Sequence, residues 1–283
     1  MPSSPALPRE VADRIWVIRH PWFDVNTTVI GGQHGVVVVD TTASSREMTR
    51  TLAAIERLGA GPVIAAVNTH AHFDHVLGNA ALGAVPIHAH EATAEALVAF
   101  GANRAPYDGS EGGGERAAEI DASPVAVPTD TFSSARVLDL GDRQVELLHP
   151  GRGHTAGDLV VRVPDADVVV AGDLVEESAP PAYGDDCWPM EWPTSLDLVI
   201  ALMTDTTVVI PGHGAVVGLD FVHEQRAGIG IVAETIRDLA GRGVPASQAL
   251  AQGEWPWPQD RLEHAVRRGY HQLPRASKRL PLI

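Results

Sequence analysis

The sequence predicts an α/β fold that contains two β-sheets. Residues 35–40 (GVVVVD) and 167–171 (DVVVA) are apolar over most of their length, which is typical of strands covered on both faces by helices or by a second sheet. Strands and helices alternate before residue 101, and a cluster of strands follows residue 131. The chain has 283 residues, enough for one large domain, which we expect to span 1–283.

The predicted strands are short runs rich in Val and Ile, each bounded by Gly, Pro, Asp or Asn. They cover residues 14–19, 27–30, 35–40, 63–67, 85–88, 136–140, 144–149, 159–163, 167–171 and 207–210. Helices are predicted at 44–58, 91–100, 195–203, 222–240 and 261–272. In the first of them, Met48, Leu52 and Ile55 form an apolar stripe, and Ser44 with Glu47 is typical of a capping box. Residues 220–283 are therefore expected to form a C-terminal helical extension.

Residues 101–131 differ in composition from their surroundings. The segment is rich in Gly, Pro, Asp and Glu and includes the run GSEGGGE. Because such a composition is typical of surface loops, we expect a partly mobile surface insertion between the two halves of the domain.

The composition excludes several classes of protein. The 36 acidic and 21 basic residues give a formal net charge of -15, which disfavours nucleic acid and anionic membranes as partners. The single cysteine, Cys187, excludes an intramolecular disulfide and a zinc site built from several cysteines. Residues 1–10 lack the apolar segment of a secretion signal, and no run approaches the roughly 18 apolar residues that span a bilayer. We expect a soluble cytoplasmic protein that acts on a small molecule; the sequence leaves its oligomeric state open.

A cluster of metal-ligating side chains follows the predicted strand at 63–67. Residues 68–79 read NTHAHFDHVLGN and present His70, His72, Asp74 and His75. Imidazole nitrogens and carboxylate oxygens are the ligands that zinc takes when cysteine is absent. Residues two apart on an extended chain point the same way, so His70 and His72 can hold one ion. Asp74 and His75 lie at the turn into the next element and can face a second ion.

Three further candidate ligands follow later strands, each beside a glycine that lets the backbone turn closely around a metal. They are His154 in PGRGHTAGD, Asp173 in AGDL and His213 in PGHG. Each motif alone is common, but together and in this order they supply the ligands that the first cluster lacks. The pair His88 and His90 is instead expected to have a structural role.

The HxHxDH motif with its downstream His, Asp and His resembles the metallo-β-lactamase superfamily, over about residues 16–213. The resemblance implies an αβ/βα sandwich of two mixed β-sheets flanked by helices, with the site at one edge of the sheets. It also implies a role for each residue of the motif: His70, His72 and His154 hold a first zinc ion, Asp74, His75 and His213 hold a second, Asp173 bridges the two, and Asp40 supports the site.

The residue at position 173 bears on the branch of this superfamily. Many of its true β-lactamases have Cys or Ser there, whereas Asp173 is similar to the glyoxalase II, lactonase and general hydrolase branches. The chain is too short to carry the flavodoxin domain of the flavin-dependent di-iron branch. A persulfide dioxygenase uses a single iron and tends to lose the ligands of the second metal, and this chain keeps both sets.

The resemblance implies a zinc-dependent hydrolase with two Zn²⁺ per chain, although Fe or Mn suits the same ligands. A metal-bound hydroxide would attack an ester, thioester, lactone or lactam carbonyl. Asp74 is the expected catalytic residue, which orients the hydroxide and passes a proton to the leaving group. The alternatives are an iron-dependent oxidoreductase of the same fold, similar to a persulfide dioxygenase, and a β-lactamase proper. A relative without activity is less favoured, because a decayed site tends to lose ligands first.

Substrate recognition is expected from residues 176–193, which follow Asp173 and are rich in proline and aromatic residues. Tyr183, Trp188 and Trp192 are candidates for an apolar pocket wall. An equally good interpretation is that the three side chains pack the loop onto the body of the protein.

Overall fold

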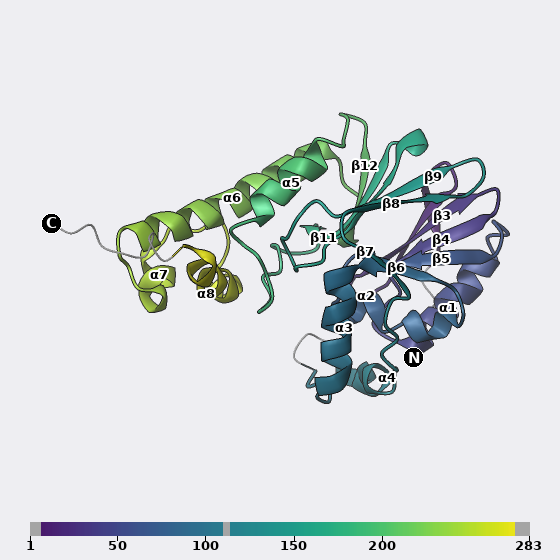
Figure 1. The fold of residues 1–283 in the computed structure, drawn as a ribbon, viewed down its shortest axis with the longest axis horizontal. Coiled ribbons are helices and arrows are strands. Elements are labelled where there is room, and N and C mark those ends of the chain that lie inside the picture. Colours follow the sequence, from purple (N-terminus) through teal and green to yellow (C-terminus); the bar gives the residue numbers. More distant parts are fainter. Residues whose placement is uncertain (1–6, 110–113, 275–283) are drawn as a thin grey trace.

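Two β-sheets packed face to face form the centre of the molecule, with helices outside each (Figure 1). The computed structural model describes residues 7–109 and 114–274. The first sheet has the order β1-β2-β3-β4-β5-β6-β7 and the second has the order β12-β11-β10-β9-β8. Both sheets are mixed, since β1 to β4 and β8 to β11 pair antiparallel, whereas β4 to β7 and the pair β11/β12 are parallel.

The strands of the first sheet are β1 Arg9–Ala12, β2 Ile15–Arg19, β3 Asn26–Gly32, β4 Gly35–Val39, β5 Val63–Val67, β6 Ile87–His90 and β7 Asp130–Phe132. Those of the second are β8 Ala135–Asp139, β9 Gln144–Leu148, β10 Val160–Val163, β11 Val168–Glu176 and β12 Val208–His213. The helices are α1 Ser45–Glu56, α2 Phe73–Val76, α3 Glu91–Asn103, α4 Ala117–Asp121, α5 Trp192–Ile200, α6 Leu219–Gly241, α7 Ala246–Gln252 and α8 Glu263–Gln272.

The valine runs are apolar on both faces because each face has its own cover. In β4, Val37 and Val39 pack between the sheets, while Val36 and Val38 pack in the cluster that contains Met48 of α1. In β11 the alternate residues divide in the same way between the second sheet's inner face and the cluster under α5 and α6. The predicted α/β sandwich with two mixed sheets and flanking helices is thus confirmed.

Helix α1 begins where the sequence predicted it, and Ser44 Oγ accepts a hydrogen bond from Glu47 N at 3.1 Å. Some predicted strand ends were wrong: β11 and β12 continue past residues 171 and 210, because their parallel pairing resumes after register shifts. Residues 101–131 contain the end of α3, all of α4 and the start of β7, so the described part of this segment is more structured than a loop.

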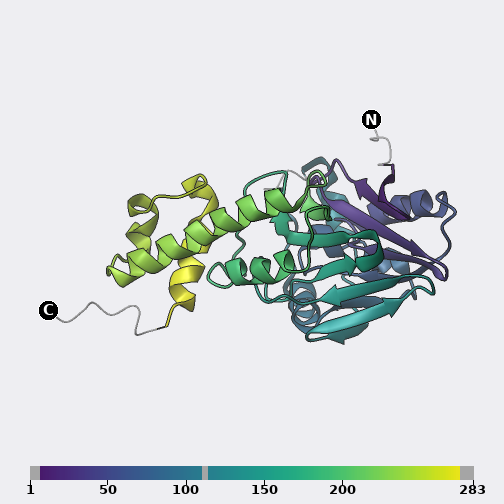
Figure 2. The ribbon, with the colours of Figure 1, turned by 90° about the horizontal axis from the view of Figure 1, so that it is seen from above.

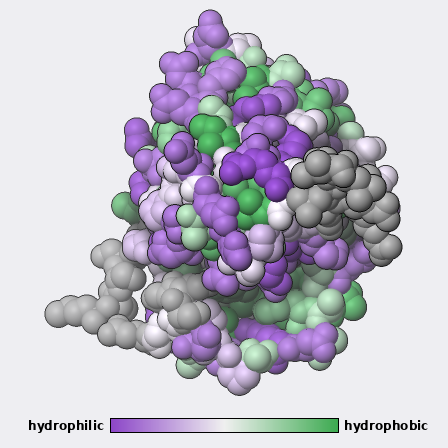
Figure 3. Space-filling model, turned by 90° about the vertical axis from the view of Figure 1, so that its left-hand side faces the viewer, coloured by the Kyte–Doolittle hydropathy of each residue, from purple (hydrophilic) through white to green (hydrophobic). Residues whose placement is uncertain are grey.

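The last part of the chain projects from the body. Figures 1 and 2 show α6 running away from the sheets, with α7 and α8 packed at its far end. The surface at this end mixes hydrophilic and hydrophobic side chains (Figure 3). Within the described ranges, no helix combines the length and apolar character needed to cross a membrane.

Candidate metal centre

Seven side chains from four separate segments of the chain meet at the edge where strands of both sheets end. They follow β5, lie in or just before α2, lie in the β9–β10 loop, or belong to β11 and β12: His70, His72, Asp74, His75, His154, Asp173 and His213. All but His72 and His213 are buried. The structure therefore brings together every residue that the motif singled out.

The first group is His70, His72, His154 and Asp173, whose ligand atoms lie within 4.8 Å of one another. His72 Nδ1 is 2.8 Å from His154 Nε2. Asp173 Oδ2 is 3.6 Å from His70 Nε2 and 3.4 Å from His154 Nε2. Three imidazoles and one carboxylate oxygen thus converge on one point.

The second group is Asp74, His75 and His213, also within 4.8 Å of one another. His75 Nε2 and His213 Nε2 are 3.1 Å apart, and Asp74 Oδ2 is 3.3 Å from His213 Nε2. Asp173 reaches this group as well, with Oδ1 3.2 Å from His75 Nε2. Its carboxylate therefore lies between the two groups.

The outer nitrogen of each histidine has a hydrogen-bond acceptor, and this leaves the lone pair of the inner nitrogen facing the cluster. The five bonds are His70 Nδ1 to Thr69 Oγ1 at 3.0 Å, His72 Nε2 to Asp186 Oδ2 at 3.3 Å, His75 Nδ1 to Asp40 Oδ2 at 2.9 Å, His154 Nδ1 to Ala182 O at 2.9 Å and His213 Nδ1 to Phe23 O at 2.7 Å. Oriented imidazoles of this kind are typical of metal ligands.

The residues fit a pair of divalent cations. His70 Nε2 and Asp173 Oδ1 are buried and make no hydrogen bond in the described structure. Buried polar atoms nearly always have a partner, so two orphans inside one cluster indicate that something else binds there. Imidazole and carboxylate groups without thiolates suit zinc, iron or manganese.

Asp40 joins two of the strands that carry the site. It directly follows β4 and adopts a φ of 61°, in the left-handed region that a non-glycine residue rarely occupies. Its carboxylate accepts hydrogen bonds from Thr69 N and Thr69 Oγ1, both at 2.8 Å, and from His75. Asp40 thus fixes His75 and the residue before His70, which is the supporting position that the resemblance implies.

The carboxylates and imidazoles of the cluster shift each other's pKa values. Burial lowers the pKa of His75, but Asp173, Asp74 and Asp40 outweigh it and hold that pKa well above its ordinary value. Burial also lowers the pKa of His213, but Asp173 and Asp74 outweigh this effect and raise that pKa. A cation that binds there must compete with the proton that these carboxylates favour, because a metal-ligating imidazole is neutral.

A cavity of about 790 Å³ opens over the cluster. Sequence reasoning missed four of its lining residues, which come from distant parts of the chain: Phe23, Asp260, Arg261 and His264. No local motif marks them, because each reaches the cavity only through the tertiary fold.

Glu176 also lines the cavity, at the end of β11, and it is buried. Its carboxylate accepts a hydrogen bond from Ser178 Oγ at 2.6 Å and lies near Asp173 and His213. Burial, followed by the charge of Asp173, raises the pKa of Glu176 to about 7. The cavity therefore has a buried acid group beside the second cluster.

Of the three aromatic candidates, only Tyr183 lines the cavity. Trp192 has no exposed surface and donates from Nε1 to Leu174 O at 3.3 Å, inside the core under α5 and α6. The Trp188 ring contacts two guanidinium groups, those of Arg152 at 3.6 Å and Arg268 at 5.3 Å from the ring centroid. For Trp188 and Trp192 the structure corrects the pocket-wall hypothesis, because both pack the loop onto the body.

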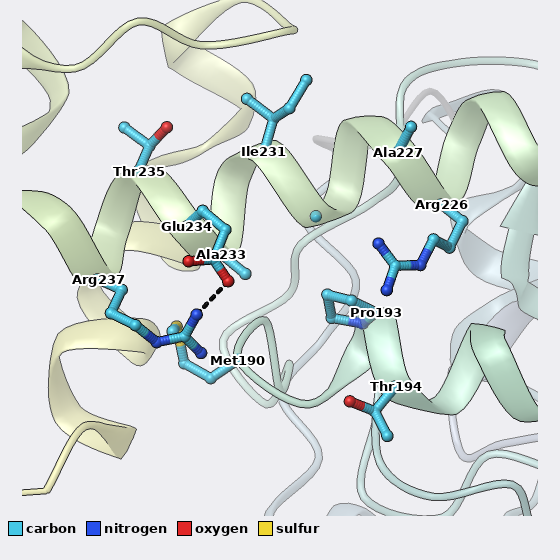
Figure 4. Close-up of a pocket in the computed structure, with 11 residues that line it drawn as sticks. Met190, Pro193, Thr194, Arg226, Ala227, Ile231, Ala233, Glu234, Thr235 and Arg237 are labelled. Carbon is cyan, nitrogen blue, oxygen red and sulfur yellow. Dashed lines mark hydrogen bonds and ion pairs between the residues drawn. The ribbon is translucent and has the colours of Figure 1, made fainter.

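Two other features lie outside the cluster. His90 is the N-cap of α3 and accepts a hydrogen bond from Ala92 N at 3.1 Å, a structural role. A second hollow lies between α6 and the first turn of α5, with Met190 just before that helix (Figure 4). Its described lining residues include no histidine or cysteine, and the ion pair that Figure 4 marks joins Arg237 to Glu234 on the same helix.

Comparisons with known proteins agree with this geometry. A model of the metallo-beta-lactamase superfamily matches residues 20–226. Metallo-beta-lactamase type 2 of Bacillus sp. (strain 170) is 27% identical over 193 residues, which are 68% of this chain and 67% of that protein. Acyl-coenzyme A thioesterase MBLAC2 of Bos taurus is 28% identical over 197 residues, which cover 60% of this chain and 67% of that protein.

Solved structures with a similar fold include metallo-beta-lactamases. The solved structure of a metallo-beta-lactamase from Pontibacter korlensis aligns with a TM-score of 0.65 and 21% identity, covering 80% of this chain and 99% of that one. The matched range 20–226 contains Asp40 and all seven clustered residues. The chain belongs to the metallo-beta-lactamase superfamily.

Proposed function

We propose that this chain is a zinc-dependent hydrolase that acts on an ester, thioester, lactone or lactam carbonyl of a small molecule. The observation that carries the proposal is the position of the Asp173 carboxylate between two groups of ligands, within 3.6 Å of a nitrogen of His70 and 3.2 Å of one of His75. One relative is named a β-lactamase and another an acyl-coenzyme A thioesterase, and both names denote hydrolases of acyl compounds.

Each group of side chains would hold one ion. His70, His72 and His154 would hold the first, Asp74, His75 and His213 the second, and Asp173 would contact both. Two zinc ions there would supply a Lewis acid for the carbonyl and a water acidic enough to serve as nucleophile near neutral pH.

Asp74 is the proposed catalytic residue. It is buried beside the cavity, and its Oδ2 lies 3.3 Å from His213 Nε2 and 3.6 Å from His75 Nε2. Burial raises the pKa of Asp74, but the charge of His75 and the hydrogen bond from His213 lower it to about 2. The carboxylate is therefore charged at neutral pH and can accept a proton from the attacking water and deliver it to the leaving group.

We expect the purified chain to hold about two zinc ions when zinc is supplied, as a two-metal site requires. The measurement is elemental analysis after removal of loosely bound metal, together with activity before and after treatment with a chelator. At most one tightly bound ion would contradict the two-metal proposal. Iron in both positions would preserve the ligand geometry but favour the oxidoreductase alternative instead.

The second candidate function is that of a β-lactamase proper, which the 27% identity to a metallo-beta-lactamase type 2 favours. Because position 173 is Asp rather than Cys or Ser, we expect only slow hydrolysis of the β-lactam nitrocefin. A panel of thioesters and lactones should include a substrate with a much higher kcat/KM. A kcat/KM for nitrocefin near 10⁶ M⁻¹s⁻¹ would lie within the usual range of roughly 10⁴–10⁸ for natural substrates. If no panel compound approached that value, the β-lactamase function would be favoured instead.

A further inference from the structure

Helix α8 lies beyond residue 226, where the match to the superfamily model ends, yet it contacts the loop beside the candidate metal centre. Arg268 Nε donates a hydrogen bond to Cys187 O at 2.9 Å, and its Nη2 donates to Asp186 O at 3.3 Å. Gln272 Nε2 donates a third bond, to Cys187 O at 3.0 Å. Two side chains of α8 therefore hold the backbone of two successive loop residues.

The same loop contacts the metal-ligand histidines. Asp186 Oδ2 lies 3.3 Å from His72 Nε2, while His72 Nδ1 faces His154 Nε2 at 2.8 Å. The next residue but one, Trp188, donates from its backbone N to Gly153 O at 2.8 Å, directly before His154. The loop therefore contacts His72 itself and the residue directly before His154, and both histidines belong to the first group.

Helix α8 is itself tightly placed. A Cβ at Gly269 would lie 2.9 Å from the side chain of Ile236 in α6 and 3.1 Å from Met190 Sδ, so α8 approaches both closely. Figure 4 shows Met190 beside α6. Tyr270 OH donates to Val244 O at 2.9 Å, and Val266 is buried in the core with Ile236. A helix that is held rigidly in place can keep the loop that its side chains bind in a fixed position.

We propose that α8 positions the first metal site: Arg268 and Gln272 hold residues 186 and 187 so that the Asp186 carboxylate orients His72. Arg268 and Asp186 are positioning residues, because Arg268 acts through the loop backbone and Asp186 through His72. The proposal rests on the proposed function only in requiring that the three-histidine group binds a cation. Partners that orient a metal-ligating histidine typically change metal affinity 10- to 100-fold when they are removed.

The test is zinc affinity, measured on the full chain by competition with a chelator, for Arg268→Ala, Asp186→Ala and the double variant. We expect each single variant to weaken one of the two sites about 10- to 100-fold and to leave the other site less affected. The double variant should weaken that site little more than Asp186→Ala alone, since both changes act through one pathway. Arg242→Ala is the matched control, because this exposed arginine of the same extension bonds only to Asp238 in the described structure.

Several outcomes separate the explanations. If Arg268 only anchors the extension, Arg268→Ala should lower the melting temperature while both zinc affinities stay at the wild-type value, and this would overturn the inference. Fully additive effects in the double variant would overturn it as well. If Arg268→Ala does not fold, Gln272→Ala removes one of the three bonds and serves in its place. A wild-type chain that binds no zinc would refute the proposed function itself. That result differs from a chain that binds two zinc ions with affinities that the substitutions leave unchanged.

Discussion

Replacing Asp74 by asparagine is expected to lower kcat by at least ~100-fold, the usual scale for losing a general acid–base group. Asparagine keeps the size of the side chain but removes its charge and its ability to accept a proton. Asp74 lies beside the cavity and within 3.3 Å of His213, so the loss acts at the reacting atoms. The change should lower the melting temperature less than His70→Ala, because His70 is more deeply buried among the ligands.

The measurement is kcat and zinc content for Asp74→Asn beside the exposed control Asp205→Asn. A variant that holds both zinc ions and loses turnover would assign Asp74 the proton-transfer role. One that loses the second ion as well would show that Asp74 acts mainly as a ligand. Full activity in Asp74→Asn would rule out both roles.

Local signals predicted part of the fold closely. The strand at 63–67 and the helix that begins after Ser44 were located because β-branched runs, caps and apolar stripes act over a few residues. The HxHxDH motif was found for the same reason, since four ligands lie within six residues after a strand. The structure then brings His154, Asp173 and His213 to it, as their order after later strands suggested.

Other features depend on contacts that no local pattern carries. Strands β11 and β12 continue beyond their glycines because each pairs with the other across register shifts. As a result, Asp173 and Glu176 lie within a strand rather than in the loop after it. The short strands β1 and β7 are defined by pairing with β2 and β6 and have little β-rich sequence of their own.

The residues around the ligands were the hardest to predict. No sequence pattern distinguishes Asp186 from the other acidic residues of its loop, yet Asp186 bonds His72, 114 positions away. Trp192 and Tyr183 are both buried in the same core cluster, but only Tyr183 also lines the cavity. Composition cannot distinguish such cases, because burial and orientation are set by the packed fold.

Gly212 permits the close approach that places Asp173 between the two groups. A Cβ at position 212 would lie 1.8 Å from Asp173 Oδ1 and 3.0 Å from Asp173 N, so the carboxylate would have to move. We therefore expect Gly212→Ala to lose tight binding of at least one zinc ion.

Turnover of Gly212→Ala should fall at least ~100-fold, the scale for misplacing a reacting group by about 1 Å. Gly241→Ala is the control, because a Cβ there meets nothing within 4 Å at the end of α6. Its zinc content and turnover should match the wild type. The comparison needs elemental analysis and kcat for both variants, along with a melting curve that shows each is folded. A folded Gly212→Ala with two zinc ions and normal turnover would mean that Asp173 need not lie between the ions, and the central observation behind the proposed function would lose its force.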